Sequence, residues 1–439
     1  MGTPGDDTLF YFGTQQHVTL TLVNPYSGRS YYIDDDFYVS SAVYDGGAGN
    51  DTLFMTPLGE YVSLTDNIAS NEVGNQILIS IEVIRGGSGG DVINLASNSI
   101  IYGDILIYGD SGDDLIFGNA GDDTIYADGG NDTLEGGPGN DLLYGEGNSD
   151  IIYGGDGSDL LSGGSGSDVL HYSADATWPG GFVAWNVGDP TDIINGDRIV
   201  VNPRDRNFDG FDGGSGIDTI QMGDASDALF LDDRYSDNPF GFNTARIRDV
   251  EIIRAGDGHD IVDLTSKQFL YGDVSIYGDG GNDVLWGNAG NDHIEGGTGN
   301  DHLDGASGND VLIGDAGNDK MFGRGGDDTL IFGDGIDQLY GGDGSDTFLM
   351  DVMDAGADHI HDFTTGVGGD VLDISSILQG YDALTDLLSD FVQLVDSNGD
   401  TCLKVNADGQ QGAYITAVIF EGGISETLTD LVNDGNLIA

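Results

Sequence analysis

Residues 109–171 constrain the fold of this chain more than any other stretch, because they form seven consecutive nine-residue units without an insertion. The first half of each unit is rich in glycine, and the sixth position is always aspartate. The eighth position is always a large aliphatic residue: Ile116, Ile125, Leu134, Leu143, Ile152, Leu161 and Leu170. A period this regular predicts a repeat architecture.

The two halves of the unit suit different backbone conformations. Glycine tolerates the positive φ angles of a tight turn, so the glycine-rich half predicts a turn. The three residues around the aliphatic position predict a short strand, whose middle side chain points inward while its neighbours point outward. Two units then make one coil of a β-solenoid, so that residues eighteen apart stack and the aliphatic row fills a thin core.

The sixth-position aspartates form rows along the turn edges of such a solenoid. Stacked strands lie about 4.8 Å apart, so neighbouring carboxylates repel one another strongly unless cations lie between them. Carboxylate and carbonyl oxygens are the hard ligands that Ca²⁺ prefers. The repeat therefore predicts divalent cations in the turns.

The second half of the chain repeats the plan of the first half after a shift of 169 residues. An array of eight units occupies 278–349, and Asp114 corresponds to Asp283. The Tyr-Gly-Asp segments at 102–104 and 271–273 correspond in the same way. Isolated units also occur, at 2–10, 46–54, 86–94, 213–221 and 255–263. The sequence thus predicts a tandem duplication of one module.

These repeats resemble the RTX (repeats-in-toxin) calcium-binding β-roll. The resemblance implies that the sixth-position aspartate and the turn carbonyls ligate several Ca²⁺ ions between stacked turns. Carried onto this chain, it implies these metal ligands: Asp7, Asp51, Asp91, Asp114, Asp123, Asp132, Asp141, Asp150, Asp159, Asp168, Asp218, Asp260, Asp283, Asp292, Asp301, Asp310, Asp319, Asp328, Asp337 and Asp346. We expect no catalytic residue and no other cofactor.

Residues 350–439 lack the glycine units and resemble a different family. Asp358–Phe363 (D-H-I-H-D-F), Gly369–Ser375 (G-D-V-L-D-I-S) and Asn436–Ile438 (N-L-I) are similar to elements of the C-terminal target domain of type I secretion substrates. The resemblance implies that an inner-membrane ABC exporter complex in a Gram-negative bacterium recognises the C-terminus.

We therefore expect an all-β fold of two tandem right-handed parallel β-rolls, followed by a small C-terminal β-rich (α+β) secretion domain. The expected parts are N-terminal strands with a leading unit at 1–45, a first module with an insert at 46–172, a connector at 173–211, a second module with an insert at 212–349, and the secretion domain at 350–439.

Composition limits the partners of the chain. It holds 13 Lys+Arg against 77 Asp+Glu, a formal net charge of -64, so nucleic-acid phosphates would be repelled. Cys402 is the single cysteine, which rules out an intrachain disulfide. No apolar run is long enough to span a membrane, and the N-terminus lacks the pattern of a signal peptide. Because residues 2–10 are already a repeat unit, we expect a fragment of a longer, monomeric protein.

Several motif matches are weaker. Ser88 lies in a G-x-S-x-G pattern, but within a repeat turn rather than before a helix, so we do not expect a nucleophile. His293 and His302 are nine residues apart and should lie on opposite sheets. His359 and His361 fit one strand face, yet no further zinc ligand is indicated nearby, and we expect them to be structural.

The connector carries two further candidates. Asp205–Gly210 matches the start of an EF-hand loop but lacks the glutamate at the twelfth position, so we interpret it as a turn and leave an extra calcium site open. Trp178 and Trp185 either form a ligand platform or pack between the two rolls.

The expected function is that of a calcium-binding, calcium-folded C-terminal region of a type I secreted adhesin, located outside the cell or at its surface. Its expected partners are the exporter and an extracellular surface ligand. The alternative is the C-terminal tail of a secreted RTX exoenzyme of the protease or lipase class, whose catalytic part lies elsewhere.

Overall fold

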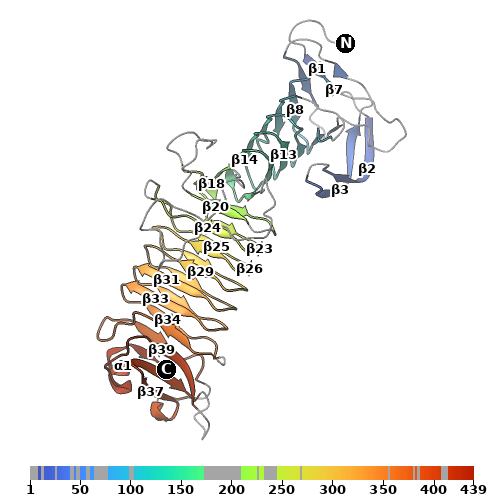
Figure 1. Cartoon of the computed structure of the whole chain (residues 1–439). Coiled ribbons are helices and arrows are strands. Elements are labelled where there is room, and N and C mark those ends of the chain that lie inside the picture. The colour runs from blue at the N-terminus through green and yellow to red at the C-terminus, as the bar shows by residue number, and fades with distance from the viewer. Residues whose placement is uncertain are drawn as a thin grey trace. The chain divides into compact units, whose positions relative to one another are not determined.

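The computed structural model describes residues 8–10, 14–24, 27–39, 44–45, 50–55, 60–63, 78–97, 103–172, 209–224, 227–231, 245–266, 269–353, 356–378, 381–382, 386–406 and 414–439. The chain divides into two compact units (Figure 1). Unit 1 comprises Met1–Gln221 with Asp233–Val250, and unit 2 comprises Met222–Asp232 with Glu251–Ala439.

Unit 1 is built from two parallel sheets. The first holds β1 (Thr8–Phe10), β5 (Thr52–Phe54), β8 (Val83–Gly87), β10 (Leu106–Asp110), β12 (Thr124–Tyr126), β14 (Leu142–Gly147), β16 (Leu160–Gly166), β18 (Gly210–Gly216) and β21 (Ile247–Arg248) in that order. The second holds β6 (Glu60–Ser63), β9 (Val92–Asn94), β11 (Leu115–Phe117), β13 (Thr133–Pro138), β15 (Ile151–Asp156), β17 (Val169–His171) and β19 (Thr219–Gln221). A short parallel pair joins β4 (Tyr44–Asp45) to β7 (Leu78–Ile79).

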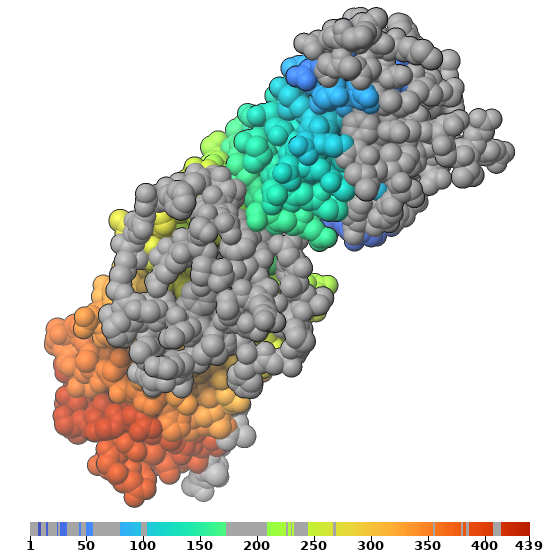
Figure 2. All heavy atoms as spheres, turned by 45° about the horizontal axis from the view of Figure 1, so that its top comes forward, coloured from blue at the N-terminus to red at the C-terminus, as the bar shows by residue number. Residues whose placement is uncertain are grey.

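The register of unit 1 confirms the predicted coil. Ile107 pairs with Ile125, Ile125 with Leu143, and Leu143 with Leu161, each eighteen residues further along the chain. Consecutive nonapeptides alternate between the two sheets, since β11 pairs with β13 rather than with β12. In the space-filling view, the side chains of successive coils form a continuous packed surface (cyan to green, Figure 2).

A long antiparallel hairpin leaves the solenoid near the N-terminus. It consists of β2 (Thr14–Val23) and β3 (Ser30–Val39), paired from Thr14↔Val39 to Val23↔Ser30. Strand β3 also pairs in parallel with β6, so the hairpin is attached to the start of the second sheet.

Unit 2 repeats the two-sheet plan. One sheet holds β20 (Ala228–Phe230), β24 (Ile261–Asp263), β27 (Val284–Trp286), β29 (His302–Asp304), β31 (Lys320–Gly325), β33 (Gln338–Asp343), β35 (Asp358–Ile360), β39 (Ile415–Phe420), β38 (Asp400–Val405) and β37 (Val392–Ser397). The other holds β22 (Ile252–Arg254), β25 (Ser275–Tyr277), β28 (His293–Glu295), β30 (Val311–Ile313), β32 (Thr329–Ile331), β34 (Thr347–Leu349), β36 (Val371–Asp373) and β40 (Leu437–Ile438). The pair β23 (Asp257–Gly258) and β26 (Gly280–Gly281) lies at the turns.

The parallel ladders of unit 2 continue past residue 350, the expected start of the secretion domain. Strand β33 pairs with β35, β34 with β36, and β36 with the C-terminal strand β40. Strands β39, β38 and β37 then add an antiparallel meander to the first sheet. The helical elements of the described residues are the 3-10 turn η1 (Leu388–Asp390) and the helix α1 (Leu428–Asp434), which a capping box at Thr427 begins and a left-handed Gly435 ends.

The core is as thin as the sequence predicts. Ile116, Leu134 and Leu161 in unit 1 are fully buried, as are Ile294 and Leu312 in unit 2, and each is the eighth residue of its nonapeptide. The prediction of a nearly all-β, parallel β-solenoid is therefore confirmed. None of the helices in the described residues is long and apolar enough to cross a membrane.

Candidate metal centre

Every predicted aspartate ligand that the structure describes is buried, although aspartate is usually a surface residue. Asp141 and Asp337 have no exposed surface, and Asp114 is the most exposed at 3%. Asp7 and residues 173–208 of the expected connector, with Trp178 and Trp185, lie outside the described residues. The buried carboxylates of each unit need compensating partners, because an uncompensated buried charge is strongly destabilising.

One carboxylate oxygen finds its partner in the neighbouring coil. The N–H of Asp123 donates to Oδ1 of Asp141 (2.7 Å), and the N–H of Asp283 donates to Oδ1 of Asp301 (2.8 Å). The same bond recurs along both arrays, always from an aspartate to the aspartate of the next coil. We call this series the aspartate ladder.

The other carboxylate oxygen is buried and accepts no hydrogen bond within the described residues. This holds for Oδ2 of Asp114, Asp132, Asp141, Asp150, Asp260, Asp283, Asp301, Asp310, Asp319, Asp328 and Asp346. An unpartnered buried oxygen that recurs at so many turns calls for a common explanation, because buried polar atoms in folded proteins almost always have a hydrogen-bond partner. A bound cation would supply the missing partner at each of these turns.

In the units that begin with glycine, Oδ2 faces a space that this first glycine leaves open. A Cβ atom on Gly296 would lie 2.6 Å from Oδ2 of Asp301 and 3.0 Å from the carbonyl oxygen of Gly314 in the next coil. One carboxylate oxygen and one main-chain carbonyl oxygen therefore face the same small volume. Both are hydrogen-bond acceptors only, which suits a hard cation.

The composition of the site distinguishes calcium from transition metals. Among the described residues, no group of three or more His, Cys, Asp or Glu side chains lies close enough to hold an ion. One carboxylate per turn must then be supplemented by carbonyl oxygens, an all-oxygen set that suits Ca²⁺ and lacks the nitrogen and sulfur ligands of zinc sites. Bound Ca²⁺ would supply positive charge to the buried carboxylates.

The pKa values of these aspartates record the cost of burial without a cation. Burial, together with the charges of neighbouring aspartates, raises the pKa of Asp114 to about 9. Burial likewise raises the pKa of Asp141 and of Asp319 to about 8, against an ordinary value of 3.8. Their backbone N–H partners lower the pKa but do not offset burial. Without cations the turns would take up protons near neutral pH.

Glycine at the fourth position sets the spacing of the coils. At Gly299 the backbone has φ +145, and a Cβ there would overlap the carbonyl oxygen of Gly281 in the preceding coil. The second position is also left-handed, even where it is not glycine, as at Asp110 (φ 70) and Arg324 (φ 78). The turn conformation is therefore imposed by stacking as well as by local preference.

A second ladder, not anticipated from the sequence, runs along the fifth position. The N–H of Asn300 donates to Oδ1 of Asn282 (2.7 Å), and the N–H of Asn318 donates to Oδ1 of Asn300 (2.9 Å). Its bonds run from each coil to the preceding one, opposite to the aspartate ladder. The signal was present in the sequence, because the fifth position is almost always Asn, Asp or Ser in the arrays.

Four further aspartates belong to the aspartate ladder although their sequence spacing does not show it. Oδ1 of Asp209, Asp358 and Asp370 each accepts a backbone N–H of an array aspartate at 3.0 Å. The N–H of Asp227 donates to Oδ1 of Asp260 (2.6 Å). The EF-hand-like stretch thus contributes Asp209 to the solenoid, while its Asp205 lies outside the described residues.

The serine and the histidines considered from the sequence lie in the turns and strands of the solenoid. Ser88 is exposed in the turn between β8 and β9. His293 and His302 lie on different sheets, since β28 pairs with β25 and β30 while β29 pairs with β27 and β31. Nδ1 of His359 lies 2.7 Å from Oε1 of Glu421, and the ring centroids of His359 and His361 are 6.3 Å apart.

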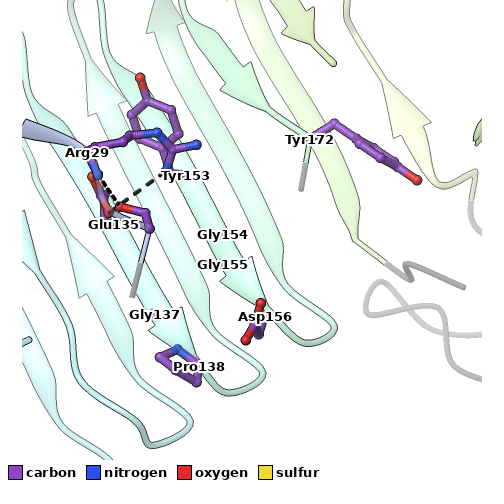
Figure 3. A pocket seen from close by; sticks show the side chains of 10 residues that line it. Arg29, Glu135, Gly137, Pro138, Tyr153, Gly154, Gly155, Asp156 and Tyr172 are labelled. Atoms are coloured by element: carbon purple, nitrogen blue, oxygen red, sulfur yellow. Dashed lines mark hydrogen bonds and ion pairs between the residues drawn. The ribbon is translucent and has the colours of Figure 1, made fainter. Parts of the chain in front are cut away.

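A surface pocket in unit 1 lies where the β2–β3 hairpin meets the second sheet (Figure 3). Arg29 lies 3.6 Å from the ring centroid of Tyr153 and 3.9 Å from the Glu135 carboxylate. Glu135 also accepts hydrogen bonds from the hydroxyls of Ser27 (2.7 Å) and Tyr31. These side chains form their hydrogen bonds and charged contacts with one another. We therefore interpret the pocket as the edge of a packing contact between the hairpin and the solenoid.

Comparisons with known proteins agree with the geometry of the turns. The model of the RTX calcium-binding nonapeptide repeat matches residues 43–54, 108–143, 135–170, 271–294, 295–330, 304–339 and 333–349. No curated protein matches the chain. A likeness to the crystal structure of the extracellular lipase LipA from Serratia marcescens has 14% identity and a TM-score of 0.12, over 89% of this chain and 45% of the lipase chain.

That TM-score carries no argument about fold or function, and this chain spans less than half of the lipase. The family match has independent support, because the buried Oδ2 atoms recur at the turns of the matched residues. The two arrays of this chain are RTX calcium-binding nonapeptide repeats, folded as β-rolls.

Proposed function

We propose that this chain is the calcium-folded C-terminal region of an adhesin that a Gram-negative bacterium secretes by a type I pathway. The buried Oδ2 atoms support this proposal most directly. At the low calcium concentration of the cytosol, repulsion among the carboxylates of a chain with net charge -64 keeps it unfolded and ready for export. Outside the cell, where calcium is near millimolar, extracellular-type sites fill and the coils fold.

Far-UV circular dichroism of the purified full chain tests the calcium step. We expect little strand signal in chelator, a cooperative gain of strand signal when Ca²⁺ is added, and a much smaller gain with Mg²⁺. Mg²⁺ keeps its water ligands and demands octahedral geometry, which makes it a poor substitute in a turn of carbonyls. Equal strand content with and without chelator would sink the proposal.

Recognition of the C-terminus by an ABC exporter complex is the second part of the proposal. Helix α1 and strand β40 form the last elements of the chain and support it, because they are an ordered C-terminal structure beyond the repeats. Deletion of 428–439 should retain the chain inside cells that co-express a type I exporter. The variant Gly129→Ala, at a site with no atom within 4 Å of the new Cβ, should be exported normally. Equal export of the truncated chain would contradict this part.

Adhesion distinguishes the proposal from an exoenzyme tail. The tandem duplication supports an adhesin, because a second calcium-folded module adds spacer length but no evident catalytic part. The sequence encoded directly upstream is the sharpest test. Tandem immunoglobulin-like repeats there would support adhesion to an extracellular surface ligand. A hydrolase motif there would instead support the exoenzyme alternative and contradict the adhesin proposal.

A further inference from the structure

In two turns of the arrays the aspartate makes different hydrogen bonds from those in the other array turns described above. We call those other turns ordinary turns. Their units begin Gly-Asn-Ala-Gly, at Gly118–Gly121 and Gly287–Gly290. The two turns correspond under the 169-residue shift between the modules. Asn119 and Asn288 thus occupy the second position, where other units place a left-handed residue. The backbone at both asparagines lies outside the left-handed region.

In the first of these turns the asparagine satisfies the carboxylate of Asp123. The backbone N–H of Asn119 donates to Oδ2 at 2.7 Å, and its side-chain Nδ2 lies 3.1 Å from both Oδ1 and Oδ2. The N–H of Ile105 donates to Oδ1 at 3.0 Å. Nδ2 also donates to the carbonyl oxygen of Gly103 at 3.0 Å, which ties the turn to the Tyr-Gly-Asp segment.

The second turn repeats this arrangement. The backbone N–H of Asn288 donates to Oδ2 of Asp292 at 2.8 Å, and Val274 N–H donates to Oδ1 at 3.0 Å. Nδ2 of Asn288 lies 3.5 Å from Oδ2 of Asp292 and 3.2 Å from the carbonyl oxygen of Gly272. Asp123 and Asp292 therefore differ from the array aspartates whose Oδ2 accepts no hydrogen bond. In these two residues N–H groups already donate hydrogen bonds to both carboxylate oxygens.

We propose that these two turns are closed without a cation, and that Asn119 and Asn288 take the place of the ion on the Oδ2 side of the carboxylate. The inference rests on the proposed calcium binding of the other turns. Each module then contains one turn that closes without calcium, next to its Tyr-Gly-Asp segment. Oδ1 of Asn288 accepts the N–H of Ala289 (2.6 Å), whereas Oδ1 of Asn119 is buried with no hydrogen-bond partner among the described residues.

Counting ions on the full chain by native mass spectrometry tests the proposal. Asn119→Gly and Asn288→Gly restore the common Gly-Gly-x-Gly turn, in which the second residue is left-handed and its N–H leaves Oδ2. We expect each variant to bind one more Ca²⁺ ion than the parent chain, and the double variant to bind two more. The matched control Glu146→Gly changes the second position of an ordinary turn (φ 72) and should leave the count unchanged.

The reverse substitution gives an independent answer. Ala306→Asn places asparagine at the second position of an ordinary turn that already accommodates a side chain (φ 71), and we expect it to bind one ion fewer. An unchanged count in the Asn→Gly variants would overturn the proposal, and so would a lower count, because that would make the asparagine oxygen a calcium ligand. If those variants fail to fold, Ala306→Asn decides alone, and an unchanged count in it would then overturn the proposal. A parent chain that binds no calcium would instead refute the proposed function.

Discussion

At the scale of single residues, the aspartate of an ordinary turn has two oxygens with different roles. Oδ1 accepts a main-chain N–H from the neighbouring coil, so it fixes the stacking of the turns. Oδ2 is left for a cation. A buried carboxylate with only one oxygen hydrogen-bonded is costly, and the structure repeats that cost at many turns of both arrays. The stability of the folded chain therefore depends on a bound cation at each of these turns.

The raised pKa values predict how pH acts on the calcium-free chain. Burial raises the pKa of Asp310 to about 8 and that of Asp283 to about 7, so the folded state binds protons that the unfolded state has released. The resulting stability is complete below the unfolded value of 3.8 and is lost as pH rises through about 7 to 8. In chelator, the chain should gain strand signal between pH 8 and pH 5, as measured by circular dichroism.

Calcium affinity should fall over the same pH range, because protons compete for the same carboxylates. Repeating the titration in high salt separates this effect from general charge screening, since salt screens exposed charges at every pH. A chelated chain that is equally unfolded at pH 8 and pH 5 would contradict the prediction.

The fourth-position glycines give a second prediction at this scale. Gly299→Ala puts a Cβ into the carbonyl of Gly281, at a φ of +145. We expect it to cost at least about 3 kcal/mol of folding free energy in calcium, because backbone cannot move aside in a closely stacked coil. Urea unfolding in saturating calcium measures this. The control Gly129→Ala meets no atom within 4 Å and should change the midpoint little.

At the scale of elements, the β2–β3 hairpin is held to the second sheet by side chains far apart in sequence. Ser27 and Tyr31 both donate to Glu135, and Tyr31 packs against Phe117 with ring centroids 5.1 Å apart. Glu135 and Phe117 point outward from the solenoid yet are buried at 3% and 0% exposure. The hairpin therefore covers a sheet face that would otherwise be open to water.

Removing the carboxylate should loosen the hairpin. Glu135→Ala leaves the hydroxyls of Ser27 and Tyr31 without their acceptor, which we expect to cost about 1–3 kcal/mol. Limited proteolysis in calcium should then cut within 14–39 faster than in the parent chain, as mass spectrometry of the fragments would show. Asp156→Ala, an exposed residue lining the same pocket, serves as the control and should be cut at the parental rate. Equal rates in both variants would refute the docking role.

The elements also show what the sequence could predict and why the rest escaped it. The nine-residue period places the strands, the core row and the sixth-position aspartates, because one register serves every coil. The hairpin contact joins residues 108 positions apart and has no period. Asp358 and Asp370 follow their ladder partners after 21 and 24 residues rather than 18, so extra loop residues hide them. Asn119 looks like an ordinary variant until its hydrogen bonds are seen.

At the scale of the whole molecule, each coil contacts only its neighbours. Stability in such an architecture is a sum of coil and interface contributions, so folding spreads from coil to coil. The two ladders of opposite direction link each coil to both neighbours through side-chain and main-chain bonds. The coils at the ends of an array therefore have fewer bonds than those within it, unless another element supplies the missing acceptors, as Asp358 and Asp370 do in unit 2.

This stacking also determines how the protein responds to mechanical load. Tension along an array acts on the bonds between coils one interface at a time, so the array should peel rather than rupture at once. Each peeled coil of 18 residues would extend to about 60 Å of chain, in place of a rise of about 4.8 Å. Optical tweezers attached at Leu270→Cys and Val352→Cys, both exposed, in a Cys402→Ser background would record repeated steps of about 55 Å.

Calcium should raise the force of most steps, because each ordinary turn that peels also loses a cation. A single large rupture of the whole array, or steps whose force is unaffected by chelator, would contradict this mechanism. An array of calcium-filled turns would then act as a serial shock absorber that lengthens under load and re-forms while extracellular calcium persists.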